Sequence, residues 1–462
     1  MNKGKKMSLF GFFTFTSAMV MSVYVYPTFA TAGFSLVFFL ILSGILWFIP
    51  TALCSAEMAS VKGWEEGGIF TWIGNTLGEK WGFVSIFFQW FQVTIGFIPM
   101  LFFITGMLSF VFNESSINNN PGIKLVIMLS IFWGLTFLQF KGTELTVRLA
   151  KIGFIFGIVL PIIFLIILSG LYVLSGNKIN IEISKSTMFP DFTDINSLVV
   201  FVSFILAYVG IEASATHINE IENPKRNYPL AIIMLCVVSI ILNMIAGLSI
   251  AIVVPKEDLN LSTGVIQSFE ILINHFFKDS RWLLVVIALI LPLSTMAKIS
   301  TWIVGPSEGI YLASEKGIIP KAFKETNKHN VPVNLVIAQG VIVSIWCFVL
   351  TFFTKGSNLS FFLSVSLTVL IYLMAYTIFF IAYYVLLFKN KNLERSYHIK
   401  GGDKVKFIVA SIGFIATVGA LIVSFFPPTQ FSPSDKKTYE SILFSSFIIT
   451  FIIPFVIYKF KK

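Results

Sequence analysis

The sequence predicts an all-α polytopic membrane protein with about twelve transmembrane helices. Of its 462 residues, 56% are hydrophobic and only 12% are charged, and the mean hydropathy is +0.86. Because soluble domains carry about 25% charged residues, this composition excludes a soluble globular fold. We therefore expect a single transmembrane domain over residues 1–462. Apolar runs of roughly the 20 residues that a bilayer requires lie at 8–32, 34–58, 82–112, 123–140, 149–175, 196–217, 229–254, 281–312, 332–353, 359–388, 407–426 and 439–458.

The basic residues gather in alternate connections between these runs. With both termini taken as cytoplasmic, 23 of the 33 Lys and Arg residues lie on the cytoplasmic side, 9 lie outside and one, Lys298, lies within the bilayer. This positive-inside distribution accounts for the net charge of +10 and predicts a multi-pass protein of the cell membrane, with no nucleic acid as partner. The three cysteines lie far apart in apolar runs, so neither a disulfide framework nor a metal site is expected.

Two of the runs are interrupted at corresponding places. In the first run, Val23–Thr28 contains Pro27, which removes an amide donor and disfavours helix at Tyr26. In the sixth run, Tyr208–Ala215 places Gly210 and Glu212 in the middle of the span. Runs one and six are five helices apart, which predicts an inverted repeat with discontinuous helices framing a mid-bilayer substrate site. The expected parts are a first repeat at 8–175, a second at 196–388 and two extra helices at 407–458. Pro and Gly are also frequent in membrane helices without any function.

Lys298 is the most unusual ionisable residue. It lies in the apolar stretch Trp282–Ile303, where a charge is costly and usually faces a bundle interior or a cavity. Trp302 follows one helical turn later and shares its face. Glu212 is the other charge deep in an apolar run, and burial would make it responsive to protons. Two interpretations stay open: a structural ion pair between Lys298 and Glu212, or direct roles in binding or coupling.

Extended strings along the chain form a family pattern, and they are Tyr24–Thr31, Ala56–Ala59, Gly63–Gly68, Gly210–His217, Asn223–Leu230 and Trp302–Ser307. The chain resembles the bacterial glutamate/GABA antiporters, a branch of the amino acid–polyamine–organocation superfamily. The resemblance covers nearly the whole chain and implies a LeuT-like fold of ten core helices plus two. It implies that extracellular glutamate is exchanged for cytoplasmic GABA by alternating access, without a cofactor, as a contribution to acid resistance. It also implies a functional link to a cytoplasmic glutamate decarboxylase.

Three positions depart from the family pattern. Val25 and Lys298 stand where the family commonly has Glu, and Glu308 stands where it commonly has Arg. The chain stops soon after its last apolar run, so the gating by a cytoplasmic tail found in this family is not expected. Because Lys298 reverses a charge beside the site, an exchanger of another pair, such as glutamine/glutamate or neutral amino acids, is the alternative. A channel needs no pair of broken helices, and no catalytic constellation for an enzyme is found.

The resemblance and the helix breaks together predict the functional residues. The expected substrate-binding set is Tyr24, Tyr26, Pro27, Thr28, Gln92, Tyr208, Gly210, Glu212, Lys298, Trp302, Tyr372 and Tyr376, with Glu212 and Lys298 as the residues for proton sensing or coupling. Tyr372 and Tyr376 are one turn apart and face the same way. Buried tyrosines and tryptophans that only pack are the alternative for each aromatic residue.

An inner gate is expected from Glu57, Glu220, Lys225 and Arg226, with a solvated charge cluster as the alternative. His217 titrates near pH 6 if it is exposed, although a lone histidine is more often structural. The segment Gly63–Gly82 predicts a short amphipathic helix on the cytoplasmic membrane surface.

Overall fold

The computed structural model describes residues 6–64, 68–141, 152–191, 195–215, 217–218, 221–278, 280–329, 331–354, 357–428 and 431–461. In these ranges, ten helical segments are long and apolar enough to cross a membrane, and they match ten of the twelve predicted runs. One of the ten is α3 (Leu36–Ser43), which continues through a π turn at Gly44–Phe48 into α4 (Ile49–Ala59). The others are α6 (Glu79–Phe112), α8 (Pro121–Gln139), α10 (Leu160–Leu174, after a π turn at Ile155–Val159), α14 (Pro224–Val253), α16 (Arg281–Glu315), α17 (Val333–Phe352), α18 (Ser357–Phe388), α19 (Gly402–Val423) and α20 (Pro433–Lys459).

The two remaining runs are broken into short helices, as the sequence predicts. The first consists of α1 (Leu9–Val20), a 3-10 turn at Val23–Val25 and α2 (Tyr26–Ala30). The sixth consists of α12 (Ile195–Ile205), a 3-10 turn at Leu206–Tyr208 and α13 (Ile211–Ala215). The all-α polytopic fold with broken helices one and six is therefore confirmed.

The break in the first run starts earlier than Pro27 indicates. The extended residues are Met21 and Ser22, whose ψ angles are 142° and 126°. Pro27 instead lies in the first turn of α2. A proline is tolerated there because the amides of a first turn have no intrahelical acceptor. The proline therefore marks the start of the second half-helix rather than the unwound segment itself.

Shorter helices lie at the ends of the bundle, and they are α5 (Gly68–Leu77), α7 (Ser116–Asn119), α11 (Lys185–Met188), α15 (Gly264–Phe276) and a 3-10 turn at Lys321–Lys324. The predicted amphipathic helix exists as α5, but its apolar face is turned toward the protein. Phe70 and Trp72 are buried, and α5 packs against α6 and α18. The Trp72 indole also donates to the Trp64 carbonyl at 3.2 Å. Burial within the bundle thus replaces the expected contact with lipid.

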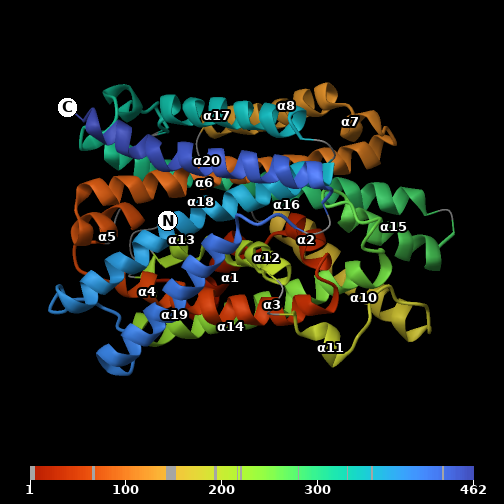
Figure 1. Cartoon of the computed structure of the whole chain (residues 1–462), viewed down its shortest axis with the longest axis horizontal. Coiled ribbons are helices and arrows are strands. Elements are labelled where there is room, and N and C mark those ends of the chain that lie inside the picture. Colours follow the sequence, from red (N-terminus) through yellow and green to blue (C-terminus); the bar gives the residue numbers. More distant parts are fainter. Residues whose placement is uncertain are drawn as a thin grey trace.

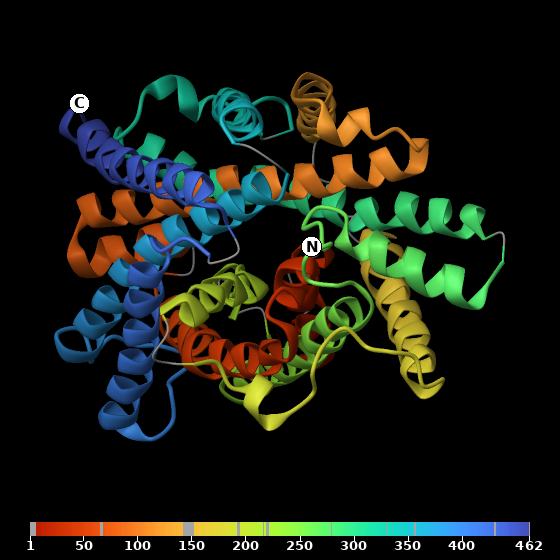
Figure 2. The same cartoon turned by 45° about the vertical axis from the view of Figure 1, so that its right-hand side comes forward.

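The helices form two groups on either side of a central layer (Figures 1 and 2). In that layer α6 packs against both α16 and α18, and α18 is the most enclosed span. The broken helices lie on one side with α3 and α14, while α8, α17 and α20 lie on the other (Figure 1). The two broken helices therefore lie next to the most enclosed part of the molecule.

Both described ends of the chain lie at the same end of the bundle. Met7 forms an isolated β-bridge with Ile221, just before α14. Lys461 forms an ion pair with Glu79, at the start of α6. The α18–α19 loop (residues 389–401) lies at this end as well, whereas α7, α11 and α15 lie at the opposite end (Figure 1).

Candidate substrate site and charge cluster

The break in the sixth helix places a carboxylate inside the bundle. Gly210 has a φ of +107°, a conformation that residues with a side chain rarely adopt. Glu212 follows in the first turn of α13 and is only 2% exposed. The unpaired amides of a helix start carry partial positive charge, which favours a carboxylate at this position. The two residues predicted from the sequence therefore act together. Gly210 allows the chain to change direction, and Glu212 places its carboxylate at the start of the helix that follows.

Two side chains from the central layer hold the Glu212 carboxylate. The Tyr372 hydroxyl on α18 donates to Oε2 at 2.7 Å, and the Gln89 amide on α6 donates to Oε1 at 3.1 Å. Gln92, the expected binding residue of α6, is buried one turn further on and makes neither contact. Gln89 and not Gln92 therefore contacts Glu212, while substrate binding by Gln92 stays a prediction. The sequence offered no means of choosing between two glutamines three residues apart.

An aromatic cluster lies beside this carboxylate. The rings of Tyr372 and Tyr376 have their centroids 4.5 Å apart, and the Trp47 ring lies 5.5 and 5.4 Å from them. Trp47 belongs to the π turn between α3 and α4, and its indole donates to Thr417 at 3.2 Å. Trp47 is not evident as a site residue from the sequence, because a tryptophan in an apolar helix is unremarkable without its neighbours. The pairing of Tyr372 with Tyr376 was predicted, and the structure brings both to the site.

Lys298 contacts the break in the first helix rather than Glu212. Its ammonium donates to the Val20 carbonyl at 3.3 Å and also to the Ser22 hydroxyl. Val20 is the last residue of α1, and the final carbonyls of a helix lack intrahelical donors and carry partial negative charge. The ion pair with Glu212 is therefore not formed. The partner of Lys298 is the carbonyl end of a half-helix, which the sequence does not mark with a charged residue.

The other predicted substrate-binding residues are all buried, but they do not all surround Glu212. The Tyr208 hydroxyl donates to the Leu40 carbonyl at 2.8 Å, so it is occupied by α3. Pro27 lies beside Gly264 at the start of α15, since a Cβ at Gly264 would lie 2.9 Å from the Cβ of Pro27. Tyr24 and Trp302 are 3% and 8% exposed.

Two hydroxyls of the predicted set have no hydrogen-bond partner within the described ranges, and they belong to Tyr26 and Thr28. Buried polar groups are normally paired, so unpaired hydroxyls are available to a ligand or to water. The broken first helix supplies both of them.

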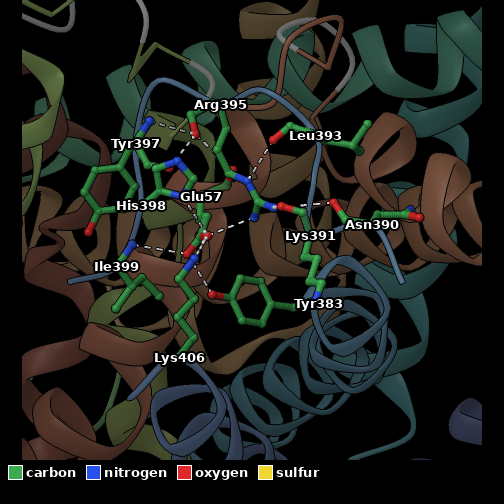
Figure 3. Close-up of polar contacts among 11 residues, drawn as sticks. Glu57, Tyr383, Asn390, Lys391, Leu393, Arg395, Tyr397, His398, Ile399 and Lys406 are labelled. Carbon is green, nitrogen blue, oxygen red and sulfur yellow. Dashed lines mark hydrogen bonds and ion pairs between the residues drawn. The ribbon is translucent and has the colours of Figure 1, made fainter. Parts of the chain in front are cut away.

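A second polar cluster surrounds Glu57, near the end of α4 (Figure 3). Glu57 is fully buried. Its Oε1 lies 2.9 Å from Nη1 of Arg395 and 2.6 Å from Nζ of Lys406. Its Oε2 accepts from the Tyr383 hydroxyl at 2.9 Å and from the Ile399 amide at 3.2 Å. We call these five residues and His398 the Glu57 cluster, which joins α4, α18, α19 and the α18–α19 loop.

Backbone pairing reinforces the attachment of the α18–α19 loop to the end of α4. The Lys62 amide donates to the Glu394 carbonyl at 2.9 Å, and the Ser396 amide donates to the Ser60 carbonyl at 3.1 Å. The loop is also fixed from within, because Arg395 donates to the Lys391 carbonyl at 2.8 Å. Arg395 therefore bridges the loop backbone and the buried carboxylate.

His398 is the titratable member of the Glu57 cluster that is partly exposed to solvent. Its Nδ1 lies 3.5 Å from Oε1 of Glu57. Burial and the nearby Lys406 ammonium hold the pKa of His398 below its usual 6.5, although the Glu57 carboxylate acts in the opposite direction. A protonated His398 would be a third cation beside a single carboxylate.

Comparison with known proteins shows which family has this sequence pattern. A family model for amino acid permeases matches residues 7–453. The chain belongs to the amino acid permease family. The permease is 53% identical over 455 residues to a glutamate/gamma-aminobutyrate antiporter of Lactococcus lactis subsp. lactis, covering 98% of this chain and 90% of the relative. It is 30% identical to an uncharacterized transporter of Legionella pneumophila over 99% and 98% of the two chains. A probable agmatine/putrescine antiporter of L. lactis is 23% identical over 92% and 90%.

The structure brings together only some of the residues predicted for an inner gate. Glu57 belongs to a charge cluster, but its cationic partners are Arg395 and Lys406. Lys225 and Arg226 do not contact Glu57; they line a cavity of about 960 Å³ together with Ser60, Lys62, Asn223, Pro224, Glu394, Arg395 and Ser396. From the sequence, the cationic partners of Glu57 were expected in the connection between the sixth and seventh apolar runs. The partners come instead from the α18–α19 loop and the start of α19, more than 330 positions away, which no local pattern indicates.

Some predicted positions cannot be placed in full. Glu220 lies outside the described residues of the permease, as does the side chain of Glu308. His217 is partly buried between α13 and α14, and Val25 is buried in the 3-10 turn of the broken first helix.

Proposed function

We propose that this permease is an antiporter that exchanges extracellular glutamate for cytoplasmic GABA by alternating access. The observation that carries the proposal is the 53% identity, over 98% of the chain, to two proteins named glutamate/gamma-aminobutyrate antiporters. The two broken helices beside a buried carboxylate are the geometry that such a mechanism uses.

The substrate would lie between the two breaks. Its ammonium group would approach Glu212, whose carboxylate is oriented by Tyr372 and Gln89. Its carboxylate would approach the start of the 3-10 turn Val23–Val25, the first helical residues after the break, whose amides lack intrahelical acceptors and carry partial positive charge. The unpaired hydroxyls of Tyr26 and Thr28 would supply further hydrogen bonds from the broken first helix.

Lys298 would act as the cation that holds the first break in shape. Its ammonium neutralises the partial negative charge at the end of α1, where it would substitute for a coupling cation. Because it also adds positive charge close to the site, it would favour a substrate with a carboxylate. Trp302, one turn later on the same face of α16, would cover the substrate from this side.

The Glu57 cluster would close the end of the bundle that carries both termini. We infer that this is the cytoplasmic end, because the basic residues predominate there. Release of a substrate to the cytoplasm would then require the α18–α19 loop to move relative to α4, with Lys225 and Arg226 lining the cavity outside it. The chain would be organised as two repeats, 8–175 and 196–388, followed by helices at 407–458 that cover the bundle from outside.

Such an exchange would remove acid from the cell. If glutamate enters as a net-neutral species and GABA leaves with a positive charge, each turnover exports one proton equivalent. A cytoplasmic glutamate decarboxylase would supply the GABA and consume the glutamate. The protein would therefore lie in the cell membrane and contribute to acid resistance.

Counterflow in proteoliposomes tests this function. Uptake of labelled glutamate would be measured with GABA, glutamine, glutamate or no amino acid inside, at pH values of about 5.5 and 7.5 on either side of the histidine range. We expect strong uptake with GABA inside and little uptake into empty vesicles. Equal uptake into empty vesicles would contradict exchange.

Lys298 motivates a second candidate, the exchange of another amino acid pair such as glutamine for glutamate. At about 6 Å and an effective dielectric of about 20, one charge contributes roughly 2.8 kcal/mol at most, which is enough to change substrate preference by two orders of magnitude. Uptake driven by internal glutamine but not by GABA would favour this candidate.

A further inference from the structure

A small pocket lies at the end of the bundle opposite to the Glu57 cluster. Its volume is about 150 Å³, and its lining comes from the α6–α8 connection and the adjoining ends of α6, α8, α17 and α18. Ser360, in the first turn of α18, lines this pocket, whereas Tyr383 of the Glu57 cluster lies near the last turn of the same helix. The pocket is therefore separate from both sites described above. If the termini are cytoplasmic, as proposed, it opens on the outer side of the membrane.

Lys124 in this pocket is a buried cation without a carboxylate. It is only 5% exposed, and its ammonium lies 4.9 Å above the ring of Phe102. No ion pair or hydrogen bond joins this ammonium to any other described residue. A buried charge is normally neutralised by a partner, because a ring face replaces only part of the lost hydration. An unpaired ammonium that faces a pocket indicates that an anion supplies the missing charge.

Two buried oxygen atoms in the same pocket also lack partners. Oδ1 of Asn118 and Oγ1 of Thr351 have no hydrogen-bond partner in the part of the chain that the structure describes. The neighbouring hydroxyls of Thr354 and Ser360 are bonded to each other. The pocket thus offers a cation and a hydroxyl to a ligand's anionic group, and an amide oxygen to a ligand's donor group.

The size and charge of the pocket restrict the ligand. One water needs about 10–15 Å³ of such space, while drug-sized ligands occupy pockets of about 300 Å³ or more. A volume of about 150 Å³ therefore suits a molecule of a few heavy atoms. The lining residues include one cation and no acid among those described, so a cationic ligand is excluded.

We propose that this pocket binds a small carboxylate that also carries a hydrogen-bond donor, as a small amino acid does. The ligand carboxylate pairs with Lys124 and accepts from the Thr351 hydroxyl. Its ammonium or hydroxyl group donates to Oδ1 of Asn118. The occupant is either the transported amino acid, held at a second site, or another small amino acid from the surroundings.

Ligand-dependent thermal stabilisation of the purified full chain tests the site. Wild type would be titrated with glycine, glutamate and acetate, and the same solutions would be applied to Lys124→Met, Thr351→Val and Lys80→Met, so that general salt effects cancel. Lys124→Met keeps an unbranched apolar side chain of similar length and should fold. Lys80→Met is the matched control, since Lys80 also lies over a phenylalanine ring, 5.1 Å from the Phe455 centroid, but is exposed and lines no part of this pocket.

We expect glycine to stabilise wild type and Lys80→Met equally, with affinity about 10- to 100-fold weaker in Lys124→Met because a charged hydrogen bond is lost. Thr351→Val should weaken the affinity by a smaller factor. Acetate should bind less tightly than glycine, since it has no donor for Asn118. Stabilisation by glutamate that also disappears in Lys124→Met would identify the transported amino acid as an occupant. The proposal is overturned if glycine has no effect on wild type, if it stabilises Lys124→Met to the same extent, or if acetate binds as tightly as glycine. None of these outcomes depends on the transport reaction.

Discussion

Replacing Glu57 by Gln should destabilise the protein strongly, because it removes the only carboxylate from the Glu57 cluster. The Glu57 side chain is fully buried, and the side chains of its partners Arg395 and Lys406 are 2% and 10% exposed. A glutamine can still accept hydrogen bonds, but it leaves two buried cations side by side without a counter-charge. Removing one member of a buried ion pair costs about 3–5 kcal/mol. Since folded proteins are stable by only about 5–15 kcal/mol, this loss is a large fraction of the total.

A neighbouring ion pair in the same loop provides the matched control. Glu394 pairs with Lys62 at 3.1 Å, but the two side chains are 78% and 77% exposed. Such surface pairs contribute about 0–1 kcal/mol, so Glu394→Gln should leave stability nearly unchanged. Both variants would be unfolded in mixed micelles by titration with a denaturing detergent, and the transition followed by tryptophan fluorescence. A loss below about 1 kcal/mol for Glu57→Gln, or a loss equal to that of the control, would refute the assignment of a buried, charge-balanced cluster.

Two further predictions concern the proposed transport site, and a third concerns the pH response of the Glu57 cluster. Gln89→Leu should raise the KM for glutamate about tenfold or more, since a hydrogen bond to a charged group is lost. Gln92→Leu should change this KM much less, and a larger effect of Gln92→Leu would contradict the reasoning. Lys298→Met should lower kcat/KM about 10- to 100-fold in the counterflow assay, and unchanged uptake would contradict its role at the end of α1. The pKa of His398 is lower in the folded state than in the unfolded chain, so the unfolded chain binds the proton more readily. Protonation of His398 should therefore destabilise the folded state as the pH falls below about 6.5. Melting temperatures at pH values of about 7.5 and 5.5 should therefore differ more in wild type than in His398→Gln, and equal differences would contradict this reasoning.

The difference between the predicted and observed partners of Glu212 and Lys298 has a common cause. Both residues were found from the sequence, because a charge in an apolar run is conspicuous. Their partners were not found, because a buried carboxylate and a buried ammonium in one protein are most simply expected to pair with each other. The structure instead gives Glu212 the side chains of Tyr372 and Gln89, and gives Lys298 the carbonyl of Val20. Neutral side-chain donors and the carbonyls at helix ends can both stabilise a buried charge, and neither leaves a charge pattern in the sequence.

The Glu57 cluster illustrates the same limit over a longer distance. Glu57 was expected to take part in an inner network, and it does lie in a buried charge cluster. Its nearest basic neighbours by topology appeared to be Lys225 and Arg226, but Arg395 and Lys406 occupy the carboxylate. The choice depends on the path of the α18–α19 loop, which pairs with the backbone at the end of α4. Backbone pairing is independent of side-chain identity, and so no motif marks it.

The sequence by itself determined the number and extent of the membrane helices, the two broken spans and the charged residues inside the bundle. These features follow from the length of apolar runs, from glycine and proline, and from the cost of burying charge, all of which are local properties of the chain. Tertiary structure alone decided which donors hold Glu212, that Lys298 binds the end of α1, and that α5 turns its apolar face inward. It also decided that Arg395 and Lys406, far along the chain, neutralise Glu57. These outcomes depend on which helices become neighbours, and that is settled by the packing of the whole bundle.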